Sequence, residues 1–250
     1  MADGLPNRDT DVLEVPWGAR QVFYGLLMAV GLLVLAIGVG IGVSLLWISA
    51  ELPEVSTTTI VQLVFALEAL LLVPPWLLGP RKYRLSWSSL GLRHSSLLGS
   101  VAVTMVGFGL VLVANWGWTL VMGRFNLQLT EKPNPLPYFG GGITGLLMAL
   151  LLGAVVAPVA EEIFFRGFLY PGLRRSWGTG WALLASAALF AVIHGFTAVI
   201  PPIFVIGLVL AISYEITGSL WPAILIHAAM NALAFISAYI VSVGGAELGF

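Results

Sequence analysis

Seven long apolar segments follow one another along the chain, separated by short polar or turn-forming stretches. They cover residues 21–49, 58–79, 97–122, 143–170, 180–199, 202–217 and 219–244. A helix needs about 20 mostly apolar residues to cross the hydrocarbon core of a bilayer. The breaks coincide with helix-ending residues, such as Gly79-Pro80, Gly178, Pro201-Pro202 and Gly218. This pattern predicts an all-α transmembrane bundle of seven spans, or of eight if one long segment is broken or re-entrant.

The composition supports the same class of protein. Hydrophobic residues make up 59% of the 250 positions and charged residues only 9%, whereas a soluble domain carries about 25% charged residues. We therefore expect a single integral membrane domain over residues 1–250, with residues 1–20 as a polar N-terminal segment. The first apolar segment is too long for the core of a signal peptide, so we interpret it as an uncleaved span. The chain has no cysteine and no basic run that would bind nucleic acid.

The basic residues predict an orientation, because cytoplasmic loops of membrane proteins are enriched in Lys and Arg. Eight of them would lie on one side of the predicted bundle, namely Arg8, Arg20, Arg81, Lys82, Arg84, Arg93, Arg174 and Arg175. The other side would receive only Arg124 and Lys132. We therefore place the N-terminus in the cytoplasm. A prokaryotic plasma membrane is our hypothesis for the location, although an organelle membrane would suit these features equally.

An acidic pair interrupts the fourth apolar segment. Glu161, Glu162 and Arg166 lie within AVVAPVAEEIFFRGFLY, although each charge near the middle of a bilayer costs roughly 2.5–3.5 kcal/mol. On a helix Glu162 and Arg166 are four residues apart and share a face, so we expect them to form a structural pair. Glu161 points about 100° away from that face, which predicts a free carboxylate.

Two further polar pairs occupy later apolar segments. Phe190 and His194 stand four residues apart in the fifth, and His227 and Asn231 stand four apart in the seventh. Such spacing places each pair on one helix face. Any one of these residues alone would more often be an interhelical hydrogen-bonding or packing residue. We also expect Glu68 and Glu215 to be packing or interfacial partners, and His94 to be a solvated loop residue.

Together these side chains are sufficient for peptide hydrolysis without a nucleophilic side chain or a cofactor. A buried carboxylate can act as general base toward water, and a nearby imidazole can orient that water. A His and an Asn that donate from one helix face can stabilise a tetrahedral oxyanion, with each such donor typically contributing about 3–4 kcal/mol. This chemistry requires the three segments to meet in one pocket.

The three motifs EEIFFR (161–166), FAVIH (190–194) and HAAMN (227–231), in this order, resemble those of the CPBP (CAAX protease and bacteriocin-processing, or Abi) intramembrane proteases, which are related to Rce1-type CAAX endopeptidases. The resemblance covers residues 143–235, which would hold the catalytic core. It implies a helical membrane fold with a polar cavity open to the cytoplasm. It also implies that Glu161 and His194 activate water, that His227 and Asn231 form the oxyanion hole, and that Glu162, Arg166 and Phe190 support them.

Two alternatives remain open from the sequence. A zinc-dependent membrane metalloprotease could use the Glu and His residues as ligands, although the His-Glu-x-x-His signature is absent. A non-catalytic scaffold, transporter or immunity protein could use the same residues to hold helices together. We expect no metal and no cofactor. The expected partners are membrane lipid and a protein or lipidated peptide substrate, whose identity and prenylation the sequence does not specify.

Overall fold

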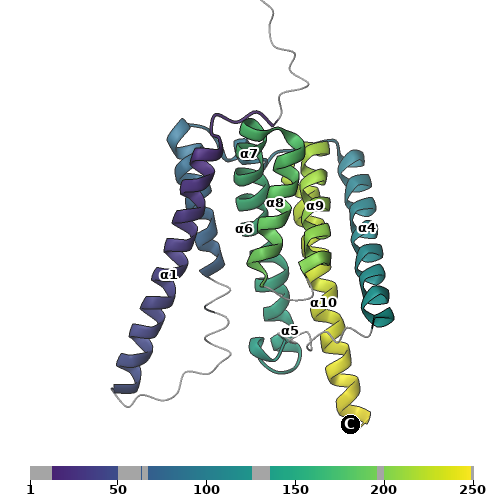
Figure 1. Ribbon diagram of the computed structural model, residues 1–250. Coiled ribbons are helices and arrows are strands. Elements are labelled where there is room, and N and C mark those ends of the chain that lie inside the picture. The colour runs from purple at the N-terminus through teal and green to yellow at the C-terminus, as the bar shows by residue number, and fades with distance from the viewer. Residues whose placement is uncertain (1–12, 50–62, 64–66, 126–135, 196–199, 249–250) are drawn as a thin grey trace, which may run out of the picture.

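The computed structural model describes residues 13–49, 63, 67–125, 136–195 and 200–248, and its described elements are all helical (Figure 1). This confirms the predicted all-α class. The elements are α1 (Ala19–Ser49), η1 (Glu68–Leu72), α3 (Val73–Trp76), η2 (Leu77–Arg81), η3 (Trp87–Leu90), α4 (Leu97–Arg124), η4 (Leu136–Phe139), α5 (Gly142–Leu151), η5 (Leu152–Val156), α6 (Ala157–Glu162), η6 (Ile163–Leu169), α7 (Tyr170–Trp177), α8 (Thr179–Ile193), α9 (Ile200–Thr217) and α10 (Leu220–Leu248).

Fewer described helices reach membrane-spanning length than the seven or eight that the sequence predicts. Five do so: Ala19–Val43, Leu97–Arg124, Gly142–Trp177, Ile200–Thr217 and Leu220–Val243. The predicted span 58–79 lies partly outside the described residues. The predicted span 180–199 is shorter because α8 ends at Ile193, after which Gly195 adopts a φ of 100°. The described part of the chain therefore supports five to seven spans.

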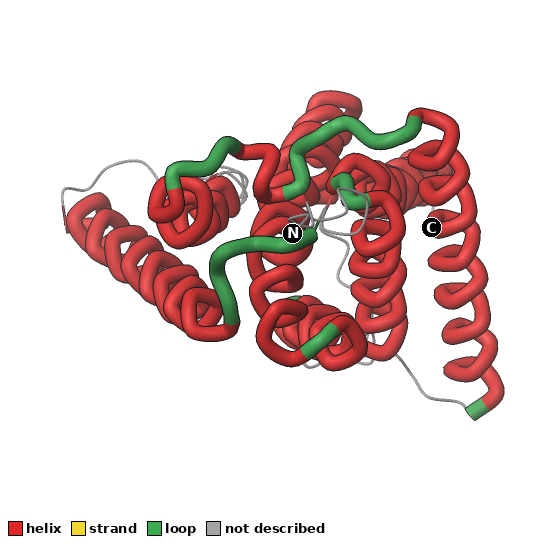
Figure 2. The backbone as a smooth tube through the Cα atoms, turned by 90° about the horizontal axis from the view of Figure 1, so that it is seen from above, coloured by secondary structure: helices red, strands yellow, loops and turns green. Residues whose placement is uncertain are grey.

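The helices that carry the polar motifs lie at the centre of the bundle. Helix α8 packs against α7 and α9, while α10 packs against α9, α6 and η5. Helix α4 lies on one flank against α9 and α10. Seen from above, α1 leans away from the central helices on the opposite flank (Figure 2). The acidic pair thus lies in α6 against α10, which supplies His227, while η6, the next turn of the same segment, packs against α8.

The segment Gly142–Trp177 is not a uniform α-helix. Its backbone widens into π-helical turns at Leu152–Val156 and again at Ile163–Leu169, on either side of α6. Turns of this kind change the direction in which the following side chains point, and they occur frequently at functional sites. The six residues of α6, which include both glutamates, therefore lie between two distortions of the same helix.

The N-terminal segment is anchored to the central helices. Trp17 is fully buried, its Nε1 donates to the Phe168 carbonyl at 2.9 Å, and its ring stacks on Phe168 at a centroid distance of 5.9 Å. Arg175 donates to the Val15 carbonyl. Residues 13–18 are therefore part of the packed structure.

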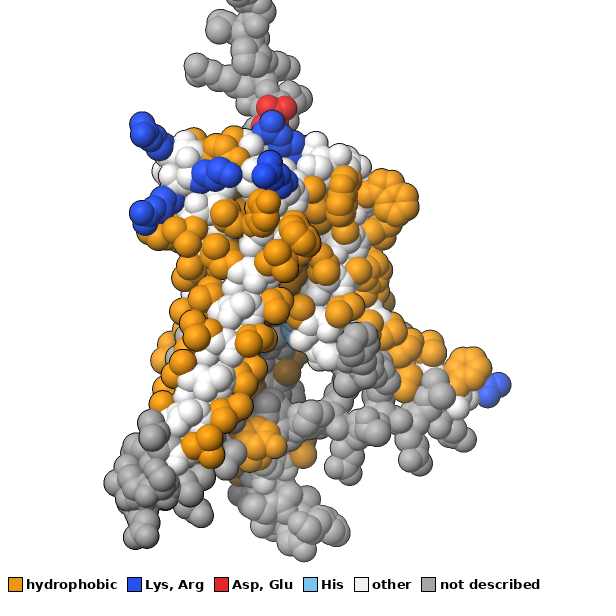
Figure 3. Space-filling view, turned by 60° about the vertical axis from the view of Figure 1, so that its left-hand side comes forward, with side chains coloured by type: hydrophobic (Ala, Val, Ile, Leu, Met, Phe, Trp, Pro, Cys, Tyr) orange, Lys and Arg blue, Asp and Glu red, His pale blue; other side chains and the backbone are white. Residues whose placement is uncertain are grey.

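Charge separates the two ends of the bundle. Figure 3 shows Lys and Arg side chains gathered at the end where α1 begins, above a broad apolar belt. Exposed basic residues at this end include Arg20, Arg81, Lys82, Arg84 and Arg175. An apolar belt below a basic end is the distribution of an integral membrane protein.

Candidate active site

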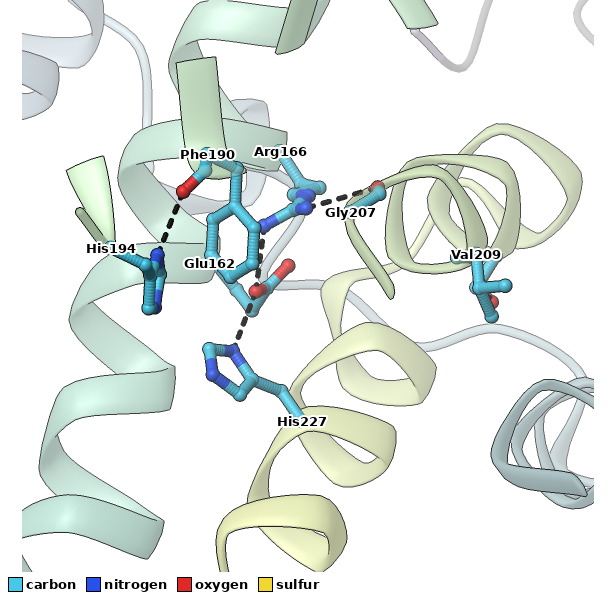
Figure 4. Close-up of polar contacts among 8 residues, drawn as sticks. Glu162, Arg166, Phe190, His194, Gly207, Val209 and His227 are labelled. Atoms are coloured by element: carbon cyan, nitrogen blue, oxygen red, sulfur yellow. Dashed lines mark hydrogen bonds and ion pairs between the residues drawn. The ribbon is translucent and has the colours of Figure 1, made fainter. Parts of the chain in front are cut away.

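Glu162 is the centre of the buried polar cluster (Figure 4). Its side chain is 0% exposed, and its Oε1 accepts hydrogen bonds from Arg166 Nη1 and His227 Nδ1, both at 2.9 Å. The Arg166 contact confirms the pair predicted from the four-residue spacing. The His227 contact joins α6 to α10 and was not predicted, so Glu162 is more than the partner of Arg166.

Arg166 connects this cluster to α9. Its Nη2 donates to the Gly207 carbonyl at 3.0 Å, and its guanidinium lies 4.4 Å from the centroid of the Phe190 ring. Gly207 permits close packing at this point, because a Cβ there would lie 3.0 Å from the Ala187 Cα of α8. The cluster thus depends on the close approach of α8 and α9.

Phe190 lies between the two histidines. Its ring centroid is 4.7 Å from that of His194 and 5.6 Å from that of His227. The two imidazoles therefore lie no farther apart than the sum of these distances. The Arg166 guanidinium also lies over this ring, so Phe190 contacts three polar side chains of the site.

The hydrogen bonds assign a proton to one nitrogen of each histidine. His194 Nδ1 lies 2.7 Å from the Phe190 carbonyl, which can only accept, so Nδ1 donates. His227 Nδ1 faces the Glu162 carboxylate and donates for the same reason. In both residues Nε2 is the nitrogen left for a substrate or water. His194 is exposed at the end of α8, whereas His227 is buried.

Glu161 differs from Glu162 in its contacts. It is half-buried, and its buried Oε2 has no hydrogen-bond partner among the described residues. It nevertheless lies close enough to interact electrostatically with both Arg166 and His227. Glu161 is therefore a carboxylate without a direct partner beside a cationic side chain and an imidazole.

Asn231 lies one turn beyond His227 on α10. Its Nδ2 donates to the Gly153 carbonyl at 2.8 Å, across the contact between α10 and η5. An amide nitrogen carries two protons, so one N–H and the Oδ1 atom remain for other partners. This bond fixes the Asn231 amide near His227, and it also links α10 to η5.

The sequence did not predict that Glu68 lies beside the candidate site. It begins η1, which packs against α6, and its buried Oε2 has no partner within the described part of the chain. It interacts electrostatically with Glu161 and His227. The sequence feature that could have indicated a role for Glu68 is its position in an apolar segment, LVFALEALLLV, with no cation within four residues.

The remaining polar residues lie elsewhere. Glu215 accepts from Tyr170 at 2.6 Å and from Arg174 at 3.1 Å, which matches the predicted interfacial role. His94 is exposed in the loop before α4. A shallow groove on the outer face of the bundle is apolar, being lined by Trp177, Trp181, Leu184, Ala185 and Ala188.

The described residues do not include a group of three His, Asp or Glu side chains arranged to hold a metal ion. Catalytic zinc sites usually use three protein ligands and leave one position open for water. Oε1 of Glu162 already accepts from Arg166 and His227. The geometry therefore gives the zinc alternative no support from these residues.

Residues 143–233 match the family model described as type II CAAX prenyl endopeptidase Rce1-like. This segment of the chain is therefore similar to the Rce1-like family. The match contains all three motifs, EEIFFR, FAVIH and HAAMN, and it extends from α5 into α10. The Rce1-like segment is thus the part of the chain that builds the buried cluster. The curated proteins yielded no match to the chain, and neither did the solved structures.

Proposed function

We propose that this chain is an intramembrane endopeptidase of the glutamate type, acting on a peptide bond of a membrane-associated protein. The observation that carries the proposal is the contact of Phe190 with both His194 and His227, together with the bond from His227 to Glu162, inside the Rce1-like segment. Glu161 precedes Glu162 in the chain and interacts electrostatically with His227. Buried charges in a membrane helix are costly, and the carboxylate of Glu161 forms no ion pair with any side chain that the structure describes.

In the proposed reaction Glu161 is the general base. It takes a proton from a water whose oxygen attacks the scissile carbonyl carbon. His194 supports this step because its Nδ1 is held by the Phe190 carbonyl, which leaves Nε2 to accept a hydrogen bond from the same water. When the carbon–nitrogen bond breaks, protonated Glu161 returns the proton to the leaving amine. The products are a carboxylate and an amine.

His227 and Asn231 are proposed to stabilise the oxyanion. Glu162 holds Nδ1 of His227, so Nε2 is the nitrogen available to the tetrahedral intermediate, to which it donates when it carries a proton. Asn231 can donate its second N–H, since the first is bound to Gly153. Arg166 balances the charge of Glu162, so that the acid can orient His227 without remaining an uncompensated buried anion.

The substrate class follows from the family rather than from the geometry. A CAAX prenyl endopeptidase cleaves near the C-terminus of a prenylated protein, and we propose a substrate of this kind. We further propose that the basic end of the bundle faces the cytoplasm, in a prokaryotic plasma membrane, because basic loops are retained there. No cofactor enters the reaction.

The test uses the purified full chain in detergent and a prenylated CAAX peptide labelled at both ends. We expect cleavage of the peptide, and we expect Glu161→Gln and His194→Ala to reduce kcat at least a hundredfold. Matched controls replace the same residue types at exposed positions, namely Glu14→Gln and His94→Ala. Undiminished cleavage by Glu161→Gln would refute the mechanism. Loss of activity on chelation, restored by zinc, would favour the metalloprotease alternative.

A further inference from the structure

An acid from outside the Rce1-like segment adjoins the proposed base. Glu68 belongs to η1, and η1 packs against α6, the helix that carries Glu161. Glu68 and Glu161 each have a buried Oε2 that lacks a partner in the described ranges. Because the sequence match begins at residue 143, nothing in it assigns a role to Glu68.

The surroundings of the two acids differ. The groups that face Glu68 are Glu161 from α6 and His227 from α10, whereas Glu161 also interacts with Arg166 of η6. Glu162, the other acid of α6, is occupied by Arg166 and His227. Like charges close together in a site of low dielectric cannot both ionise at low cost, so such a pair shares one proton. Of the two acids, only Glu161 interacts with the Arg166 cation, so Glu68 is the better candidate for the neutral member of such a pair.

We propose that Glu68 is a positioning residue, whose protonated carboxyl group donates a hydrogen bond to the Glu161 carboxylate and orients it toward the attacked water. This inference rests on the proposed function of Glu161. The pair would resemble a dyad in which one carboxyl serves as base and the other remains neutral. It would also account for the partly buried Glu68, whose buried Oε2 has no hydrogen-bond partner among the described residues.

The test compares two replacements of similar size. Glu68→Leu removes the donor, and we expect kcat to fall about tenfold or more with KM unchanged, as for a lost interaction with the base. Glu68→Gln keeps a neutral donor, and we expect it to restore most of kcat. Since an amide cannot lose its proton, the alkaline limb of the pH profile that arises from Glu68 should disappear in Glu68→Gln. Thr104→Val is the matched control, because it removes another buried, unpartnered oxygen, from α4.

The outcomes separate this inference from the proposed function. Unchanged kcat and pH profile in Glu68→Leu, with Glu161→Gln inactive, would overturn the role of Glu68 alone. Equal losses in Glu68→Leu and Glu68→Gln would overturn it as well, because a neutral donor would then not suffice. Full activity in Glu161→Gln would overturn the proposed function itself. Thermal unfolding of each detergent-solubilised variant identifies any loss that results from misfolding, and a destabilised Glu68→Leu would be assessed through Glu68→Gln.

Discussion

The two adjacent glutamates of α6 have different environments and should respond differently to the same replacement. Glu162 is fully buried and accepts from two donors, whereas the buried Oε2 of Glu161 has no partner among the described residues. Removing one partner of a buried ion pair leaves the other charge uncompensated and typically costs about 3–5 kcal/mol. Neutralising a carboxylate that has no partner carries no such cost.

We therefore predict that Glu162→Gln lowers both stability and activity, while Glu161→Gln lowers activity alone. Thermal unfolding in detergent should show a drop in Tm of several degrees for Glu162→Gln and less than about 2 °C for Glu161→Gln. Equal Tm values for the two variants would contradict the assignment of Glu162 as the partner of Arg166 and His227.

Local spacing accounts for what the sequence could predict at this scale. The Glu162–Arg166 pair follows from the four-residue helical repeat, and so does the proximity of Phe190 and His194. The bond from His227 to Glu162 joins positions 65 residues apart, and no periodicity within one helix reveals it. Asn231 was predicted as an oxyanion donor, but its bond to Gly153 depends on how α10 packs on η5.

At the scale of elements, the site depends on how closely α8 and α9 approach. Gly207 of α9 faces Ala187 of α8, and the Gly207 carbonyl accepts from Arg166. A methyl group at position 207 would lie 3.2 Å from the Ala187 Cβ and 3.3 Å from its carbonyl oxygen. The helices would have to separate, which would move the acceptor of Arg166.

Gly207→Ala should accordingly destabilise the protein by about 1–3 kcal/mol, as overpacking does, and it should reduce peptide cleavage. Gly109→Ala in α4 is the control, since a Cβ there meets no atom within 4 Å and Ala favours a helix over Gly. The check is the Tm and the initial velocity of both variants. A Gly207→Ala protein as stable and active as Gly109→Ala would show that the contact has no energetic role.

Hydropathy predicted where helices lie better than their local form. The segment predicted at 143–170 extends over Gly142–Trp177 and contains two π-helical stretches. Apolarity measures burial in lipid and carries no information about hydrogen-bond register, so these distortions could not be foreseen. The end of α8 at Ile193 was missed for a similar reason, because most residues from Phe196 to Ile200 are apolar.

At the scale of the whole molecule, the N-terminal half supports the Rce1-like segment. Trp17 packs on Phe168 and donates to its carbonyl, and η1 brings Glu68 against α6. The family match does not include Trp17 or Glu68, yet Trp17 contacts Phe168 of η6, and η1 packs against α6, which carries the acidic pair. We infer that the proposed site is completed by the whole chain.

Replacement of the anchor tests this view. Trp17→Ala removes a fully buried ring and its hydrogen bond, for which a loss of about 3–5 kcal/mol is typical. Trp181→Ala is the control because Trp181 is 71% exposed on the apolar surface. Thermal unfolding should show a large fall in Tm for the first variant and little change for the second. Similar Tm values would indicate that residues 13–18 do not stabilise the bundle.

The central claim is that a carboxylate, rather than a metal ion, activates water in this membrane protein. Its most direct test is the initial velocity of prenylated-peptide cleavage by Glu161→Gln, measured beside wild type and Glu14→Gln in the presence of a chelator. We predict that wild type and Glu14→Gln cleave at equal rates despite the chelator, while Glu161→Gln is at least a hundredfold slower. Cleavage by Glu161→Gln at the wild-type rate would contradict the account.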